Sequence, residues 1–365
     1  MKRALTIALC FVLLITSGSS SWACSAFCLV TKAGPVCGQN YDWHLGDGLV
    51  LINKRGIQKQ GLVDDSNPAE WTSRFGSVTF NQYGREFPCG GMNEAGLVIT
   101  ISMLGRTRYP DEDDRAAVNV PQWIQYQLDT ANSVADVLAS DEEIRIAAVS
   151  NARVHFFVTD KSGDCATVEF LRGKMVVHRG EDLPFRVLTN STYESSSSWV
   201  AEFEGFGGDR RVGNSFRGSR FATAAERLSS FDDATDPVKH AFITLNRIAQ
   251  GHFTKWSIVY DSAGQKIHFR TLRAHDRRTI DLAKCDFSPA SPVKMLDINA
   301  RHGGDALPHF VDYSAKKNRQ VATRTLRGTG VLNGAHRSTI DRVCRYPETC
   351  VPVKNGASLS PVDDK

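Results

Sequence analysis

Apolar and polar positions along this chain form two kinds of pattern, which predict strands and helices. Short stretches that alternate or run apolar are typical of strands, and polar turns separate them. Other segments place apolar residues at helical spacing. Strands are expected at 24–31, 36–42, 98–104, 153–160, 165–171, 174–178, 185–188, 255–261, 265–272 and 279–283, with two or three more between 49 and 83. Helices are expected at 120–132, 133–139, after 220, and between 236 and 251.

The helix after Asp236 is the best specified in the chain. Asp236 is a suitable N-cap, and Pro237 suits the first helical turn. Gly251 marks the end of the helix. Its apolar face consists of Val238, Ala241, Phe242, Leu245, Ile248 and Ala249.

The first 23 residues have the pattern of a secretory signal peptide. A charged start, Met1–Arg3, precedes the apolar run Ala4–Thr16, which is too short to span a bilayer comfortably. Ser21 and Ala23 place small side chains where signal peptidase requires them for a cut before Cys24. We therefore expect a periplasmic or secreted protein whose mature chain begins at Cys24.

Composition narrows the function classes further. Removal of residues 1–23 lowers the formal net charge from +4 to +2, because Lys2 and Arg3 leave, and this gives no general case for nucleic acid. Eight of nine cysteines remain, and Cys344 and Cys350 are close enough in sequence to pair. No later segment is apolar enough to cross a membrane. Metal-binding spacings, a phosphate-binding loop and a dinucleotide fingerprint are all missing from the sequence, so neither metal nor cofactor is expected.

An N-terminal Cys24 would hold a nucleophile and a base in one residue. Its α-amine would have an unperturbed pKa of about 7.7, which lets it accept the thiol proton near neutral pH. Two other fates remain open, which are lipidation of Cys24 and pairing in a disulfide. The strand that starts at Cys24 is followed by the turn 32–35 and a returning strand that ends at Asp42. This hairpin brings the Asp42 carboxylate beside Cys24, where it can hold the ammonium group in place.

Two motifs carry a resemblance to a known family. The first combines Cys-Ser-Ala-Phe at 24–27 with Gly-Gln-Asn-Tyr-Asp-Trp at 38–43, and the second is Gly-Met-Asn-Glu-Ala-Gly-Leu at 91–97. Both resemble the choloylglycine hydrolase family, which includes bile salt hydrolases and penicillin V acylases. The resemblance extends over about residues 24–285. It implies an α+β fold, the four-layer αββα sandwich of N-terminal-nucleophile hydrolases, and it implies a homo-oligomer, a tetramer in the family.

The resemblance also assigns roles to residues farther along the chain. Leu-Thr-Asn-Ser at 188–191 resembles the family motif whose asparagine donates to the oxyanion, which implies this role for Asn190, although Thr192 replaces the family proline. Met103 has the position of a pocket residue whose backbone amide also faces the oxyanion. Asn190 could equally belong to an ordinary turn or a glycosylation acceptor, and Met103 to the core.

Arg220 and Gln39 complete the set of expected site residues. Ser-Arg-Phe at 219–221 resembles the family motif whose guanidinium lies beside the sulfur, and the alternative is an arginine exposed to water. A cation there favours the thiolate. Gln39 stands where bile salt and penicillin hydrolases usually carry arginine, so the chain loses a positive charge near the nucleophile.

The predicted function is hydrolysis of a linear amide bond in an N-acyl small molecule. Penicillin V, conjugated bile salts and N-acyl homoserine lactones all remain open as substrates. The alternative is a secreted, disulfide-stapled binding protein that keeps the fold without the chemistry. The catalytic domain is expected at 24–288, and the turn-rich extension 289–365 contains a basic segment without acids at 314–340. We expect this extension to be a solvated tail, with binding to an anionic surface as the alternative.

Overall fold

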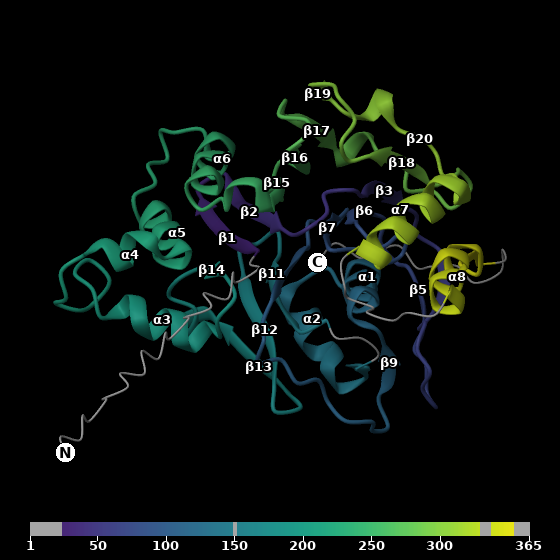
Figure 1. Cartoon of the computed structure of the whole chain (residues 1–365), viewed down its shortest axis with the longest axis horizontal. Coiled ribbons are helices and arrows are strands. Elements are labelled where there is room, and N and C mark those ends of the chain that lie inside the picture. The colour runs from purple at the N-terminus through teal and green to yellow at the C-terminus, as the bar shows by residue number, and fades with distance from the viewer. Residues whose placement is uncertain (1–23, 149–151, 329–336, 354–365) are drawn as a thin grey trace, which may run out of the picture.

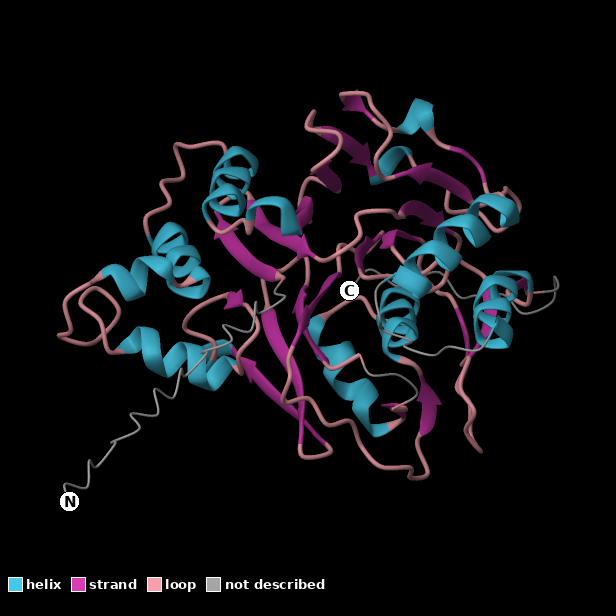
Figure 2. Cartoon of the chain, in the orientation of Figure 1, coloured by secondary structure: helices cyan, strands magenta, loops and turns pink. Residues whose placement is uncertain are grey.

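The computed structural model describes residues 24–148, 152–328 and 337–353, so the predicted signal peptide lies outside the described residues. Two large sheets dominate the fold (Figures 1 and 2). In spatial order the seven-stranded sheet consists of β14 (Val187–Leu188), β1 (Ser25–Thr31), β2 (Gly34–Asp42), β15 (Thr254–Asp261), β16 (Lys266–Thr271), β17 (Arg278–Asp281) and β19 (Gly304–Asp305).

The nine-stranded sheet contains the middle of the chain and part of its C-terminal region. In spatial order its strands are β13 (Lys174–Arg179), β12 (Cys165–Leu171), β11 (Val154–Thr159), β8 (Val98–Met103), β7 (Gly90–Asn93), β6 (Ser77–Asn81), β3 (Leu49–Asn53), β18 (Lys294–Asp297) and β20 (Val311–Asp312). Two small sheets pair β9 (Ala116–Val118) with β10 (Ile144–Ile146), and β4 (Ile57–Gln60) with β5 (Glu70–Thr72) and β21 (Val351–Pro352).

Helices cover the outer faces of both large sheets. The described helices are α1 (Val120–Thr130), α2 (Val134–Ala139), α3 (Tyr193–Ala201), α4 (Asn214–Gly218), α5 (Arg220–Ser229), α6 (Pro237–Arg247), α7 (Ala315–Gly328) and α8 (Arg337–Arg345). Successive residues of β2 show the layering, since side chains alternate between the faces of a sheet. Gln39 donates to the carbonyl of Ile101 in the facing sheet, whereas Asn40 donates to the carbonyl of Leu245 in α6. The predicted four-layer α+β fold is confirmed.

Most predicted elements are present with small shifts of their ends. The predicted strand 165–171 is β12 with the same bounds, and the helix predicted after Asp236 is α6, with that aspartate accepting at its N-cap. Four strands, β3 to β6, occupy residues 49–83, where two or three were expected. Helix α3 was not predicted, because its serine-rich sequence carries little apolar periodicity.

The expectation of a solvated C-terminal tail is wrong. Strands β18 and β20 extend the nine-stranded sheet, and α7 packs Val321 against Leu49 and Leu51 of β3. Helix α7 has an apolar face of small and aliphatic residues. The sequence did not predict this face, because basic and polar residues make up most of the segment. No helix among the described residues is long and apolar enough to span a membrane.

The described cysteines are all free thiols, so the expected pairing of Cys344 with Cys350 is not formed. Cys344 instead packs in a small core with Ala322, Leu326 and Ile340, at the contact of α7 with α8. This core joins the two C-terminal helices without a covalent link.

Candidate active site

Cys24 immediately precedes β1 and lies in the space between the two large sheets. The pairing of Ser25 with Asn40 continues outward, so Cys24 comes to lie at the end of β2, as the hairpin predicted. Its sulfur lies 3.9 Å from the backbone carbonyl oxygen of Asp42, and the residue is only 3% exposed. The predicted nucleophile is therefore shielded from bulk solvent but still forms part of a cavity wall.

The Asp42 carboxylate is held by residues that the sequence did not point to. Thr254 Oγ1 donates to one carboxylate oxygen at 2.5 Å, and Gln250 Nε2 donates to the other at 2.9 Å. Burial raises the pKa of Asp42, while these two hydrogen bonds and the charge of Arg220 act in the opposite direction. Both donors come from the turn after α6 and the start of β15, more than 200 positions away in the chain.

The contacts of the Arg220 guanidinium explain why an arginine stands at the start of α5. Ser219 caps this helix by accepting from the backbone of Ala222. The guanidinium donates to the carbonyl of Cys24 at 3.1 Å and to the Ser25 hydroxyl at 2.5 Å. It also lies 3.9 Å from the Asp42 carboxylate. These acceptors outweigh the unfavourable positive end of the helix dipole, so the bland alternative of a freely exposed arginine does not hold.

Asn190 follows β14 and connects Arg220 to the facing sheet. Its side-chain oxygen accepts from Arg220 at 3.0 Å, and its Nδ2 donates to the backbone carbonyl of Met103 at 2.7 Å. An amide nitrogen carries two hydrogens, so one remains for a substrate oxygen. Cys24, Asp42, Asn190 and Arg220 are thus brought together, as the family resemblance implied.

The backbone of Met103 turns toward the same place. Leu104 donates to the carbonyl of Arg153 in the pairing of β8 with β11. Because bonded and non-bonded pairs alternate in an antiparallel ladder, Met103 directs its N–H and C=O away from β11. On that side β7 pairs with β8 only as far as Thr100, three positions before Met103, so β7 does not cover the Met103 backbone. The amide of Met103 therefore points toward the side on which Asn190 lies.

The surroundings of Cys24 favour the protonated form of its thiol. Burial raises the pKa of this thiol, and the nearby Asp42 carboxylate raises it further. The hydrogen bond with the Asp42 backbone and the charge of Arg220 lower it, but they do not compensate for burial. A thiol in this setting requires a nearby base before it can attack a carbonyl.

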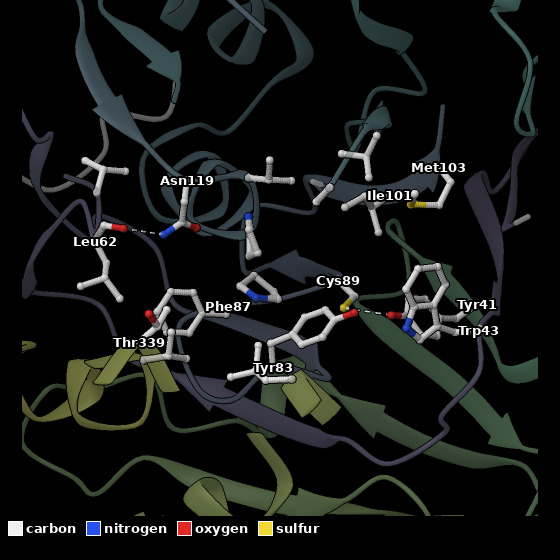
Figure 3. A pocket seen from close by; sticks show the side chains of 18 of the residues that line it. Tyr41, Trp43, Leu62, Tyr83, Phe87, Cys89, Ile101, Met103, Asn119 and Thr339 are labelled. Carbon is white, nitrogen blue, oxygen red and sulfur yellow. Dashed lines mark hydrogen bonds between the residues drawn. The ribbon is translucent and has the colours of Figure 1, made fainter. Parts of the chain in front are cut away.

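A cavity of about 300 Å³ opens beside Cys24 (Figure 3). Aromatic and aliphatic side chains form most of its wall, and Met103 is among them, as expected. Figure 3 shows Tyr83 and Phe87 on one side of the cavity and Ile101 and Met103 on another. The lining also includes Leu326 of α7 and Thr339, Arg342 and Val343 of α8, so the C-terminal extension closes one end of the cavity.

Gln39 does not take part in the cavity wall. Its side chain is 1% exposed and lies between the sheets, where Nε2 donates to Ile101 at 3.4 Å. The Tyr260 hydroxyl donates to Gln39 Oε1 at 3.5 Å. Gln39 is on the same face of β2 as Tyr41, which lies opposite Cys24, and it is two residues farther from the end of the strand. Its predicted role as a substrate-binding residue is not supported by a place in the cavity.

Sequence reasoning missed several contributors to the site. Gln250 and Thr254 flank the short turn Gly251–Phe253, and their polar side chains beside a helix end gave no reason to connect them with Asp42. The α8 residues were hidden in a segment that looked like a tail. Among the described residues, no group of three or more histidine, cysteine or acidic side chains is arranged to hold a metal ion.

Comparisons with known proteins find similar sequences over most of the chain. Residues 24–229 match the family model of linear amide C-N hydrolases of the choloylglycine hydrolase family. A penicillin V acylase of Pectobacterium atrosepticum is 24% identical over 363 aligned positions, which cover 84% of this chain and 95% of the relative.

Solved structures give the same result. The structure of a penicillin V acylase from Agrobacterium tumefaciens superposes with a TM-score of 0.69 at 25% identity, covering 80% of this chain and 98% of that one. A variant of the conjugated bile acid hydrolase from Clostridium perfringens has a TM-score of 0.62 at 17% identity, covering 76% and 98%. At that identity the second likeness concerns the fold alone.

Proposed function

Because the chain belongs to the choloylglycine hydrolase family of linear amide C-N hydrolases, we propose that it cleaves N-acyl amides through Cys24 as an N-terminal nucleophile. The observation that best supports this proposal is that Arg220 contacts the Cys24 carbonyl, Asn190 and Asp42. These contacts surround the one cysteine that the predicted signal cleavage would leave at the N-terminus. The same cleavage would place the mature protein in the periplasm or outside the cell.

The reaction begins with loss of the thiol proton to the α-amine of Cys24. Burial raises the pKa of the thiol, so the amine that cleavage releases supplies the base that the uncut chain lacks. The sulfur then bonds to the amide carbon, and the carbonyl oxygen becomes an oxyanion. Asp42 orients the ammonium, and Arg220 provides the fixed positive charge that favours thiolate.

Asn190 Nδ2 and the Met103 amide stabilise the oxyanion. Loss of one such donor typically costs about 100- to 1,000-fold in turnover. The ammonium returns the proton to the leaving nitrogen as the C–N bond breaks, and an acyl thioester remains on Cys24. Water then attacks the thioester, the acid departs, and the thiol is restored. No cofactor is needed for these steps.

The cavity supports an apolar acyl group as the part of the substrate that is bound. Tyr83, Phe87, Ile101 and Val343 offer aromatic and aliphatic contacts and little hydrogen bonding to that group. The phenoxyacetyl group of penicillin V and the alkyl chain of an acyl homoserine lactone both have this character. We rank these two above a conjugated bile salt, whose hydroxylated ring system would bring polar groups against this wall.

The test compares three purified chains that differ only at the nucleophile. They are the mature chain starting at Cys24, a chain with one alanine added before it, and Cys24→Ser. Release of free amine is measured from penicillin V, glycocholate and an acyl homoserine lactone, together with the intact mass and N-terminal sequence. In the extended chain the Cys24 nitrogen is an amide, which cannot accept a proton near neutral pH, so we expect no activity. Cys24→Ser should retain a trace at most, because a hydroxyl is far harder to ionise than a thiol.

Native-rate turnover by an alanine-extended chain that does not trim itself would disprove the N-terminal base. A mature chain that starts elsewhere, or a blocked Cys24 without activity, would instead favour a non-catalytic binding protein on this fold.

A further inference from the structure

A fully buried histidine–glutamate pair lies behind Asn190. His155 of β11 and Glu169 of β12 face each other across the ladder, since the pairing of Phe156 with Val168 continues to them. His155 Nδ1 lies 2.8 Å from Glu169 Oε1, and both side chains are completely buried. The proposed reaction does not use either residue.

The pair holds the backbone on both sides of Asn190. His155 Nε2 lies 2.7 Å from the carbonyl oxygen of Thr189, the residue just before Asn190. Glu169 Oε1 accepts from the backbone N–H of Tyr193 at 3.0 Å, three residues after it. The segment that carries Asn190 is therefore fastened at two points to the nine-stranded sheet, whereas β14, from which it emerges, belongs to the other sheet.

Hydrogen-bond chemistry defines the proton content of this pair. The Thr189 carbonyl can only accept, so His155 must donate from Nε2. Between Nδ1 and Oε1 a second proton is then required, on either atom, because two lone pairs would otherwise face each other. In both arrangements the pair is neutral overall and keeps both of its contacts. It thus acts as one rigid unit without a net buried charge.

Stability alone does not account for this unit. Among the described residues no donor reaches Glu169 Oε2, which is buried, and an unpaired buried oxygen is unfavourable. Apolar side chains such as Phe157, which lies on the same face of β11, would fill the space with less cost. The pair is better explained by what it holds in place.

We propose that His155 and Glu169 are positioning residues for the oxyanion site, acting through Asn190. Without their contacts the 189–193 segment can shift, and Nδ2 of Asn190 no longer faces the substrate oxygen while Cys24 and the acyl cavity stay as they are. The inference rests on the proposed amidase function. It predicts a defect in turnover and none in the thiol.

The test uses the full mature chain with Glu169→Gln and His155→Gln, and His240→Gln as the matched control. His240 is another buried histidine whose Nε2 bonds a backbone carbonyl, that of Arg227, away from Asn190. For both pair variants we expect kcat on penicillin V to fall about 10- to 100-fold, less than loss of a whole oxyanion donor. KM and the rate of Cys24 alkylation by iodoacetamide should stay within about twofold of the unmodified chain, as they should for the control.

A double-mutant comparison separates positioning from general damage. In an Asn190→Ala background, His155→Gln should cost almost nothing further, because the group it positions is already gone. Full multiplication of the two losses would overturn the proposal, as would an unchanged kcat or an equal loss of alkylation rate. If His155→Gln does not fold, the isosteric Glu169→Gln carries the same comparison. An unmodified chain without activity on any amide would overturn the proposed function, and the inference with it.

Discussion

At the scale of single residues, the site is a set of polar side chains that hydrogen-bond to one another and to nearby backbone groups. Asp42 has both oxygens engaged, and Arg220 touches three different acceptors near Cys24. These hydrogen bonds limit how far the Asp42 and Arg220 side chains can move. Replacing a single member tests a single contact.

Asp42→Asn should preserve the fold but reduce kcat by roughly 100-fold or more, because the Cys24 ammonium loses its anionic anchor. The measurement is kcat on penicillin V, with thermal unfolding as the check on folding. Asp233→Asn, a change of the same kind at an exposed ion pair with Lys32, should leave turnover unchanged. Normal activity of Asp42→Asn would remove this carboxylate from the mechanism.

Gln39→Arg should lower the apparent pKa of the Cys24 thiol, since a cation nearby favours the charged form. The same change should reduce the free energy of unfolding by about 1–3 kcal/mol, because a buried guanidinium has more donors than Ile101 and Tyr260 can satisfy. A profile of alkylation rate against pH and a urea titration measure the two effects. Gln58→Arg at an exposed position of β4 is the control, and an unshifted profile would show that position 39 does not influence the sulfur.

At the scale of elements, α8 has the clearest consequence for function. It lies against α7 through Ile340 and Cys344, and it presents Thr339 and Val343 to the cavity. Arg342 on the same helix forms an ion pair with Asp64, which also lines the cavity. Because that pair is exposed it contributes little stability, and apolar packing holds α8 in place.

Val343→Phe should shorten the cavity and separate substrates by the size of their acyl group. We expect kcat/KM for a long-chain acyl homoserine lactone to fall at least about 10-fold, with a much smaller change for a short-chain one. Val351→Phe on exposed β21 makes the same change away from the cavity and serves as the control. Equal losses for both chain lengths would mean that α8 does not set acyl length.

At the scale of the whole molecule, a buried ionic cluster joins three parts of the chain. Lys59 of β4 pairs with Glu86 at 2.6 Å and with Asp129 of α1 at 2.8 Å. Burial lowers the pKa of Lys59, but the two carboxylates outweigh it and raise the pKa overall. The segment that contains Glu86 continues into Phe87 and Cys89 of the cavity wall, so the cluster also supports the site.

Lys59→Met should therefore destabilise the protein by about 3–5 kcal/mol, because Asp129 would remain buried without a cation and Glu86 would keep only Arg85. Chemical denaturation at neutral pH measures this loss. Lys32→Met removes an exposed ion pair and should change the free energy of unfolding by less than about 0.5 kcal/mol. Similar values for the two variants would show that the buried cluster is not needed for stability.

Sequence alone was enough for features that depend on neighbours along the chain. The spacing between Cys24 and Asp42 predicted the hairpin, and the cap and apolar face after Asp236 predicted α6. The family motifs pointed to Asn190 and Arg220, which the structure places together with Cys24. For the hairpin and for α6 the pattern lies within a few turns or one hairpin, where backbone geometry relates position to direction. The roles of Asn190 and Arg220 came from the family resemblance alone.

Only the tertiary structure decided which distant residues complete the site. Thr254 reaches Asp42 because β15 pairs with β2, and Gln250 reaches it from the turn before β15. His155 reaches Thr189 from the other sheet. The segments that form α7 and α8 were expected to be a solvated tail because most of their side chains are polar. A narrow apolar stripe is nevertheless sufficient to pack them against the rest of the protein. Local spacing sets the direction of a side chain, whereas its partner depends on how whole layers pack, and that packing is a property of the entire chain.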